Sequence, residues 1–196
     1  MSVIQKLKRV ATQILFPVVC ISCSRYLEEN SQEDLLCGGC FAKIGISIEV
    51  PNSQVLSIGS YSSKPMRDLI HELKFKHSTK ALRHIRELIR KYFEINPNSQ
   101  LIRYDLITFV PLHHKRERLR GFNQAKFIAD ILSKEMKVET HKTLKRVRET
   151  REQSSVKDFD QKLKNVKECF SLLENPLIKN KKIILVDDVY TSGATT

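Results

Sequence analysis

The chain has 196 residues and a formal net charge of +12 at pH 7, from 34 Lys and Arg against 22 Asp and Glu. Its length suits one ordinary domain with a small appendage, and 41% hydrophobic with 29% charged residues allows a packed core and excludes a disordered chain. No apolar run approaches the roughly 20 residues that span a bilayer, and the positive charge suits either an anionic partner or simply a soluble basic surface.

Residues 1–16 are predicted to form an amphipathic helix, because apolar side chains from Val3 to Leu15 recur at helical spacing. Basic residues lie early in this segment, but no small-residue cleavage site follows them. We therefore expect a cytoplasmic protein rather than a secreted one. The helix is expected to pack on the body of the protein or on a partner, with a weak membrane-surface role as the less favoured alternative.

Residues 17–45 carry two C-x-x-C pairs separated by thirteen residues, namely Cys20 with Cys23 and Cys37 with Cys40. Two sulfurs three positions apart on a tight turn can hold one side of a Zn²⁺ tetrahedron, and a second pair closes it. Disulfides would require an oxidising compartment, for which the chain offers no signal peptide. The spacing predicts a zinc ribbon whose closed ligand set makes the metal structural and not catalytic.

Residues 46–196 alternate between strand and helix patterns, which predicts an α/β fold with a parallel sheet. A fifth cysteine, Cys169, stands alone and is predicted to be a buried core thiol. The expected elements are short strands between Ile46 and Tyr61, helices at Met66–Phe75 and Ala81–Phe93, a strand at Leu106–Val110, a helix at Phe122–Met136, a two-stranded ribbon of Thr143–Val147 with Cys169–Leu173, and a strand at Lys182–Val186.

The last twelve residues predict a sugar-phosphate site. Ile183 to Val186 is an apolar run typical of a fully buried strand, and the acids Asp187 and Asp188 follow it. Hydroxyl side chains and one glycine then run to Thr196. At the carboxyl end of a parallel strand, backbone N–H groups and hydroxyls can bind a phosphate, while the two acids accept hydrogen bonds from ribose hydroxyls. An ordinary polar turn is the alternative.

A basic segment follows the other central strand. From Val110 the sequence passes through a loop rich in Lys and Arg to the predicted start of a helix at Phe122. Such a loop beyond a parallel strand can hold a diphosphate, and Arg120-Gly121 is the part that we favour. A solvated basic loop is the alternative. His113 and His114 have no evident partners, so surface histidines are the default interpretation.

A charged segment from Arg146 to Lys164 lies between the two ribbon strands. A mobile loop there can fold over a bound substrate and exclude water, and an ordinary flexible loop is the alternative.

These segments resemble the ComF (ComFC) family, competence-associated proteins with the type I phosphoribosyltransferase fold. The resemblance covers most of the chain in order, and the "VPL…RGFNQA" signature is highly specific. The matching segments are Leu15-Phe16-Pro17 with the four cysteines, Leu73-Lys74-Phe75, Val110-Pro111-Leu112 with Arg120-Gly121-Phe122-Asn123-Gln124-Ala125, Arg148-x-Thr150 with Gln153, Asn165-Val166 before Phe170, and Leu185 to Thr195.

The resemblance implies a site for phosphoribosyl pyrophosphate, in which Asp187 and Asp188 would hold the ribose hydroxyls. The 5′-phosphate would be wrapped by Thr191, Ser192, Gly193, Ala194 and Thr195. The pyrophosphate would face Leu112, His113, Arg116, Arg118, Arg120 and Gly121. A hood would include Arg148, Arg151, Gln153 and Lys162. Mg²⁺ would arrive with the diphosphate, and a nitrogen nucleophile would attack C1′ as pyrophosphate leaves.

The implied architecture is a parallel-sheet, type I phosphoribosyltransferase-like core at residues 46–196 behind the zinc ribbon. Relatives continue into a helix and at least one more strand, so we expect the C-terminal part of this core to be missing after Thr196. His77 stands where the family has glycine, and Lys162 stands where the hood has arginine. Lysine still binds phosphate but without bidentate geometry.

A non-catalytic function is the alternative that the resemblance leaves open. The family is associated with natural transformation, and the chain combines a net charge of +12 with a zinc ribbon. A scaffold of the competence machinery that binds single-stranded DNA or competence proteins would keep the fold without turnover.

Overall fold

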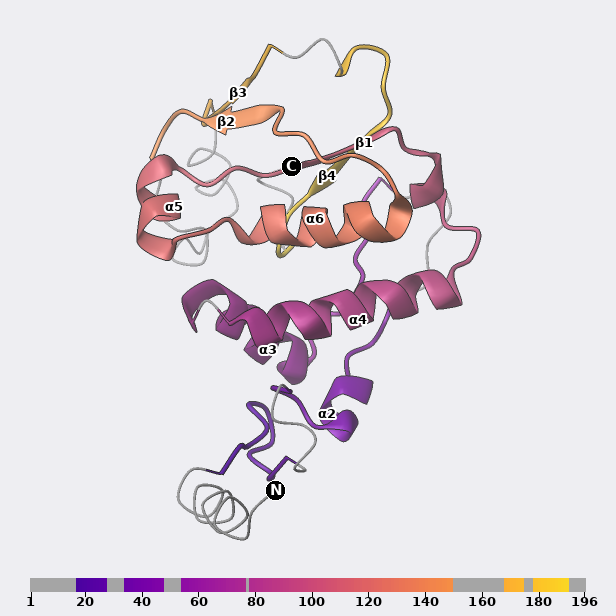
Figure 1. The fold of residues 1–196 in the computed structure, drawn as a ribbon, viewed down its shortest axis with the longest axis vertical. Coiled ribbons are helices and arrows are strands. Elements are labelled where there is room, and N and C mark those ends of the chain that lie inside the picture. Colours follow the sequence, from indigo (N-terminus) through magenta and orange to yellow (C-terminus); the bar gives the residue numbers. More distant parts are fainter. Residues whose placement is uncertain are drawn as a thin grey trace, which may run out of the picture. The chain divides into compact units, whose positions relative to one another are not determined.

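The structure is a computed structural model, and it describes residues 17–27, 34–47, 54–76, 78–149, 168–174 and 178–190. The chain divides into two compact units (Figure 1). The first takes in residues 1–46 and 59–84, and the second takes in residues 47–58 and 85–196. The predicted helix of residues 1–16 lies outside the described residues, and the predicted domain boundaries stay predictions.

The first unit contains helix α2 (Gly38–Ala42), helix α3 (Lys64–Lys76) and the start of helix α4 (Thr79–Ile95). Helix α3 confirms the prediction and begins two residues earlier. Its core face follows the helical spacing of its apolar residues. The buried side chains of this unit include Leu36, Ile44, Leu69, Ile70, Leu73 and Ala81.

Helix α4 also confirms the prediction, and from Ile85 onward it belongs to the second unit. Leu88, Ile89 and Tyr92 are buried there. The helix ends at Ile95, just before Asn96-Pro97, because proline has no backbone N–H to continue it. The backbone N–H and the side-chain amide of Asn96 both donate to the Tyr92 carbonyl, at 2.9 and 3.0 Å. A 3₁₀ turn, η2 (Gln100–Arg103), then leads to the sheet.

The second unit is built on a parallel strand pair, as predicted (Figure 1). Strand β1 (Leu106–Phe109) is buried throughout and pairs with β4 (Ile183–Val186) in the register Leu106↔Ile183 to Phe109↔Val186. Helix α6 packs against both strands.

The prediction that the last strand is fully buried was wrong. Only Val186 of β4 is buried, and Leu185 is 38% exposed. Strand β4 has β1 on one side, and within the described residues no strand pairs with its other side. An apolar run shows that a strand can be covered on both faces, but the neighbouring elements decide whether it is covered.

A two-stranded ribbon confirms another prediction. Strand β2 (Leu144–Arg146) pairs antiparallel with β3 (Phe170–Leu172). The ribbon joins the sheet through a buried hydrogen bond of 2.8 Å between the hydroxyls of Thr108 and Thr143. Cys169, just before β3, is fully buried, as predicted.

The predicted basic loop after β1 was wrong, because residues His114–Arg120 form a helix, α5. It ends at Gly121, whose φ of 73° lies in the left-handed region that favours glycine. Helix α6 (Gln124–Met136) begins two residues later than predicted, after Asn123, whose side chain accepts a hydrogen bond from the backbone N–H of Lys126.

Between residues 46 and 61 the described residues contain only an isolated antiparallel bridge, Ile46↔Gly59, in place of the predicted short strands.

In the described part of the chain, no helix combines the length and the apolar character needed to cross a membrane.

Candidate metal centre and candidate ligand-binding edge

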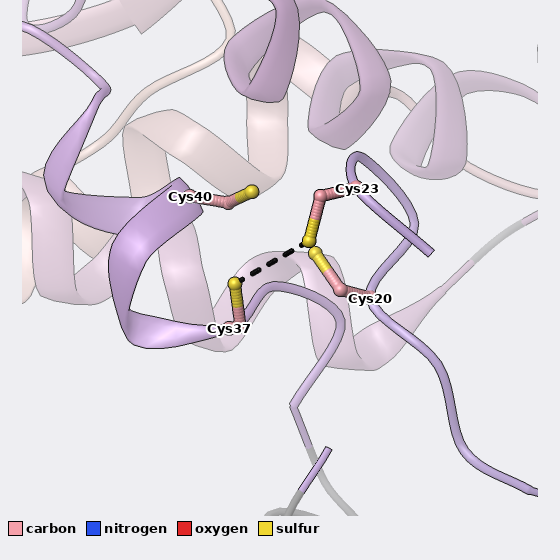
Figure 2. Close-up of side chains that lie close together, drawn as sticks. All are labelled: Cys20, Cys23, Cys37 and Cys40. Carbon is pink, nitrogen blue, oxygen red and sulfur yellow. Dashed lines mark hydrogen bonds between the residues drawn. The ribbon is translucent and has the colours of Figure 1, made fainter. Parts of the chain in front are cut away.

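The four cysteines of the predicted zinc ribbon converge, and they are positioned to hold a metal ion (Figure 2). Their sulfur atoms all lie within 4.8 Å of one another, and the sulfurs of Cys23 and Cys37 are 3.7 Å apart. Tetrahedral zinc with Zn–S bonds of about 2.3 Å separates its sulfur ligands by about 3.8 Å. All four are free thiols, so the geometry fits a four-coordinate metal and not a disulfide pair.

Each C-x-x-C pair sits on a tight turn. In the first, Ser24 donates its backbone N–H to the Cys20 carbonyl at 2.9 Å and adopts a left-handed φ of 60°. In the second, Cys37 precedes helix α2, and the backbone N–H groups of Cys40 and Phe41 both donate to its carbonyl, at 3.0 and 2.9 Å. These turns point the sulfurs of each pair the same way.

A buried histidine that sequence reasoning missed holds the second pair in place. The Nε2 atom of His84 accepts hydrogen bonds from the backbone N–H groups of Leu35 at 2.9 Å and Leu36 at 3.4 Å. His84 comes from helix α4 and is only 5% exposed. The signal in the sequence was weak: His84 lies three residues after Ala81 and four before Leu88, and all three side chains are buried.

The electrostatics of the cluster favour a bound cation. The backbone N–H and the guanidinium of Arg25 lower the pKa of the Cys23 thiol to about 6. Burial, followed by hydrogen bonds from the neighbouring thiols, raises the pKa of Cys40 to about 12. Sulfurs this close cannot all ionise unless a cation lies among them, and a metal ion needs all four as thiolates.

The second candidate site is the edge of the sheet where β1 and β4 end. The backbone N–H of Val110 donates to the Val186 carbonyl at 2.9 Å, so the two strands end side by side. Asp187 and Asp188 therefore follow β4 at the edge where Pro111 follows β1. The backbone N–H of Asp188 donates to Oδ1 of Asp187 at 2.8 Å, which orients that carboxylate.

The basic residues after β1 lie on α5, and no side chain of this helix is buried. Arg118 is exposed, whereas Arg116 and Arg120 are half-buried. Leu112, which precedes them, is half-buried, and Gly121 closes the helix.

His113 corrects the default interpretation of a surface histidine, since it is only 6% exposed, whereas His114 is exposed. Burial lowers the pKa of His113, and the charges of His114, Lys115 and Arg146 lower it further, against the opposing charge of Glu149. Its Nδ1 atom is buried, and in the described part of the chain it has no hydrogen-bond partner.

The ribbon contributes two arginines. Arg148, a predicted hood residue, is exposed, and its Nε lies 3.4 Å from the sulfur of Cys169. Arg146, which begins the charged segment noted in the sequence, is half-buried. Its spacing two residues after Leu144 places it on the same strand face as an apolar side chain.

Several predicted site residues lie outside the described residues. From the phosphate loop these are Thr191, Ser192, Gly193, Ala194 and Thr195, and from the hood they are Arg151, Gln153 and Lys162.

Comparisons with known proteins identify several relatives of the chain. It is 29% identical to competence protein F of Haemophilus influenzae over 181 residues, covering 90% of this chain and 74% of that protein. It is 31% identical to DNA utilization protein YhgH of Salmonella typhi over 163 residues, covering 82% of this chain and 68% of that protein. It is 28% identical to competence protein ComFC of Bacillus subtilis over 131 residues, covering 66% of this chain and 50% of that protein.

No family model matches the chain, and no solved structure matches it. The first two of these relatives cover more than four fifths of the chain. The chain belongs to the ComF family.

Proposed function

We propose that the chain binds phosphoribosyl pyrophosphate with Mg²⁺ at the edge where β1 and β4 end, and transfers the phosphoribosyl group to a nitrogen nucleophile of an acceptor. The observation that carries this proposal is the parallel register from Leu106↔Ile183 to Phe109↔Val186. It puts the acid pair after β4 beside the segment that leads into basic helix α5. Ligands of parallel sheets bind at this edge, and the family resemblance implies a type I phosphoribosyltransferase core.

In this proposal each group at the edge has a defined task. Asp187 and Asp188 accept hydrogen bonds from the two ribose hydroxyls and so orient C1′. The residues from Thr191 to Thr195 bind the 5′-phosphate. Cations after β1 stabilise the charge that develops on the leaving pyrophosphate. Mg²⁺ neutralises part of the diphosphate charge when the substrate binds.

The metal of the four-cysteine centre is proposed to be structural zinc. Cys20 and Cys40 are buried, and four sulfurs fill a tetrahedral shell. Such a centre has no open position for a substrate or a water nucleophile, so its contribution is to folding.

The test is calorimetric titration of phosphoribosyl pyrophosphate into the protein with Mg²⁺. We expect binding that the double substitution Asp187→Asn/Asp188→Asn weakens by at least about 100-fold, because two charge-assisted hydrogen bonds are lost. Asp130→Asn is the matched control, since Asp130 pairs with Lys126 on the surface of α6. Absence of binding by the unaltered protein would disprove the proposal, as would equal affinity of the double variant.

A second candidate function is the binding of single-stranded DNA in DNA uptake. The names of the relatives, competence protein and DNA utilization protein, point this way. Helix α5 supports it, because it presents Lys115 and Arg118 to solvent and buries none of its side chains.

The dependence of binding on salt concentration tests the DNA-binding candidate. Contacts to phosphates of single strands make the logarithm of the binding constant fall by about 0.7 per phosphate for each logarithmic unit of salt. The double substitution Arg118→Gln/Arg120→Gln should lower both DNA affinity and this slope. DNA affinity that ignores salt would count against this candidate.

A further inference from the structure

His84 contacts the chain on both sides of the second cysteine pair. Its Nε2 atom accepts the backbone N–H groups of Leu35 and Leu36, which lie just before that pair. Its ring centroid lies 5.5 Å from the ring centroid of Phe41, which directly follows the pair. Because the two N–H groups share the lone pair of Nε2, this atom holds the backbone and is not available as a metal ligand.

The segment that His84 holds is also bonded to the first cysteine pair. Ile21 lies between the two cysteines of that pair and donates its backbone N–H to the Leu35 carbonyl at 2.9 Å. Leu35 therefore uses both of its backbone polar groups, its N–H toward His84 and its carbonyl toward Ile21. A continuous chain of hydrogen bonds thus runs from helix α4 to the turn of the first pair, and such bonds polarise and strengthen one another.

This chain of hydrogen bonds acts on the separation between the two pairs. The sulfurs of Cys23 and Cys37 come from different pairs and lie 3.7 Å apart, close to the separation in a tetrahedral zinc site. The turn within a pair orients its own two sulfurs and does not set their distance from the other pair. Within the described ranges 17–27 and 34–47, the bond between Ile21 and Leu35 is the only backbone-to-backbone hydrogen bond that joins the two pairs.

Burial makes the contact with His84 difficult to replace with water. The imidazole is only 5% exposed, and its hydrogen bond with Leu36 is buried. Loss of the acceptor would leave two backbone N–H groups without a partner, and buried donors of this kind are costly. The segment would have to shift to satisfy them, and Leu35 would shift with it relative to Ile21.

A contact from helix α3 to the first pair differs in its exposure. Lys64 donates its ammonium to the Ser22 carbonyl at 2.8 Å and also pairs with Asp68 at 2.7 Å. The Lys64 side chain is 59% exposed, so water can take its place at the Ser22 carbonyl. Lys64 therefore provides a comparison for a contact that reaches a cysteine pair without fixing it.

We propose that His84 is a positioning residue of the four-cysteine centre, which sets the separation between its two C-x-x-C pairs and thereby its affinity for a metal ion. This inference rests on the structural zinc of the proposed function. It assigns part of the metal affinity to helix α4, which contributes no ligand to the cluster of four cysteines.

The test measures the zinc affinity of the full chain by competition with a chromophoric chelator. His84→Leu removes the acceptor and should weaken zinc binding by about 10- to 100-fold, the usual effect of replacing a residue that orients metal ligands. His84→Gln provides an amide oxygen as acceptor in a side chain of similar size and should recover most of this loss. His71→Leu is the matched control, because His71 is an exposed histidine of α3, and it should leave the affinity unchanged. Lys64→Gln should weaken zinc less than His84→Leu does.

A spectrum of the cobalt(II)-substituted protein reports the geometry of the centre separately from its stability. The visible absorption of cobalt(II) depends on tetrahedral coordination. At saturating cobalt, His84→Leu should show weaker bands than the unaltered protein, and His84→Gln should restore them. A residue that only stabilises the fold would leave the spectrum of the saturated protein unchanged, and that result would overturn the inference.

The unaltered protein supplies a measurement that does not depend on the folding of His84→Leu. The backbone N–H groups of Ile21, Leu35 and Leu36 should be protected from hydrogen exchange while zinc is bound. They should lose this protection together when a chelator removes the metal, because metal binding and ligand positioning are reciprocally coupled. Exchange rates that the chelator leaves unchanged would contradict the proposed role of His84.

The outcomes separate this inference from the proposed function. An unaltered chain that binds no zinc disproves the structural metal centre. If the unaltered chain binds zinc, this inference alone is disproved by normal affinity of His84→Leu, by an equal loss in His71→Leu, or by a His84→Gln variant that binds no better than His84→Leu.

Discussion

At the scale of single residues, His113 makes the folded protein sensitive to pH. Burial holds its pKa below the ordinary value of about 6.5. Between the lowered and the ordinary pKa the unfolded chain binds more protons than the folded protein, so stability falls as pH decreases through this window. Above pH 6.5 the residue is neutral in both states and has no such effect. Urea unfolding between pH 5 and 7.5 should show this loss, and His113→Gln should reduce its slope.

His114 supplies the control for this experiment. Its ring lies 4.2 Å from that of His113, but the side chain is exposed. His114→Gln should therefore keep most of the stability loss on acidification, because burial is the larger cause of the lowered pKa of His113 and the charge of His114 the smaller one. An unchanged slope in His113→Gln would mean that other groups cause the pH dependence.

Three residues show what a sequence can and cannot predict at this scale. Asp187 and Asp188 were predicted site residues because acids directly after an apolar strand follow a recognisable pattern. The burial of His113 was missed because the sequence shows no partner for it, and the ribbon charges that act on its pKa, Arg146 and Glu149, are distant in sequence. Burial of a polar side chain is a property of its neighbours in space.

At the scale of elements, Asn123 connects α6 to β1. Its side-chain Oδ1 accepts from the backbone N–H of Lys126 at 3.2 Å, and its Nδ2 donates to the Val110 carbonyl at 3.0 Å. Asn123→Ala removes a helix cap and leaves a buried carbonyl without its donor. We expect a loss of about 2–4 kcal/mol in the free energy of unfolding, measured in urea.

The variant Asn123→Asp refines this prediction. It keeps the acceptor for Lys126 but places a carboxylate oxygen against the Val110 carbonyl. It should be destabilised through that second contact alone. If Asn123→Ala is within about 0.5 kcal/mol of the unaltered protein, the side chain is not an essential connection between the two elements.

Helix α5 explains why some elements cannot be read from a sequence. The prediction of α3, α4 and α6 rested on apolar side chains at helical spacing. Helix α5 buries none of its residues, so His114–Arg120 shows no such spacing and resembles a basic loop. A helix with no core face produces no hydrophobic period to detect. The basic character was predicted correctly, but not the conformation that carries it.

At the scale of the whole molecule, local patterns predicted the parts better than their surroundings. The two C-x-x-C pairs predicted a cluster that forms with sulfurs within 4.8 Å. Alternating strands and helices predicted parallel pairing, which β1 and β4 confirm. The exposure of Leu185 was not predicted, because the apolar run does not show which elements cover β4.

Metal removal should affect the two units unequally. The cluster orders residues 34–47 through turns that depend on Cys37 and Cys40, whereas the second unit has its own buried strand pair. Metal binding to such a site contributes directly to folding. We expect a chelator, or Cys37→Ser/Cys40→Ser, to speed backbone hydrogen exchange in residues 34–47 and α3 while β1 stays protected.

Cys169→Ser is the control for metal removal. That thiol lies outside the cluster, so the variant should still bind one metal per chain. Equal loss of protection in β1 would mean that the metal stabilises both units together, and retention of metal by the double variant would mean that the four cysteines are not its ligands.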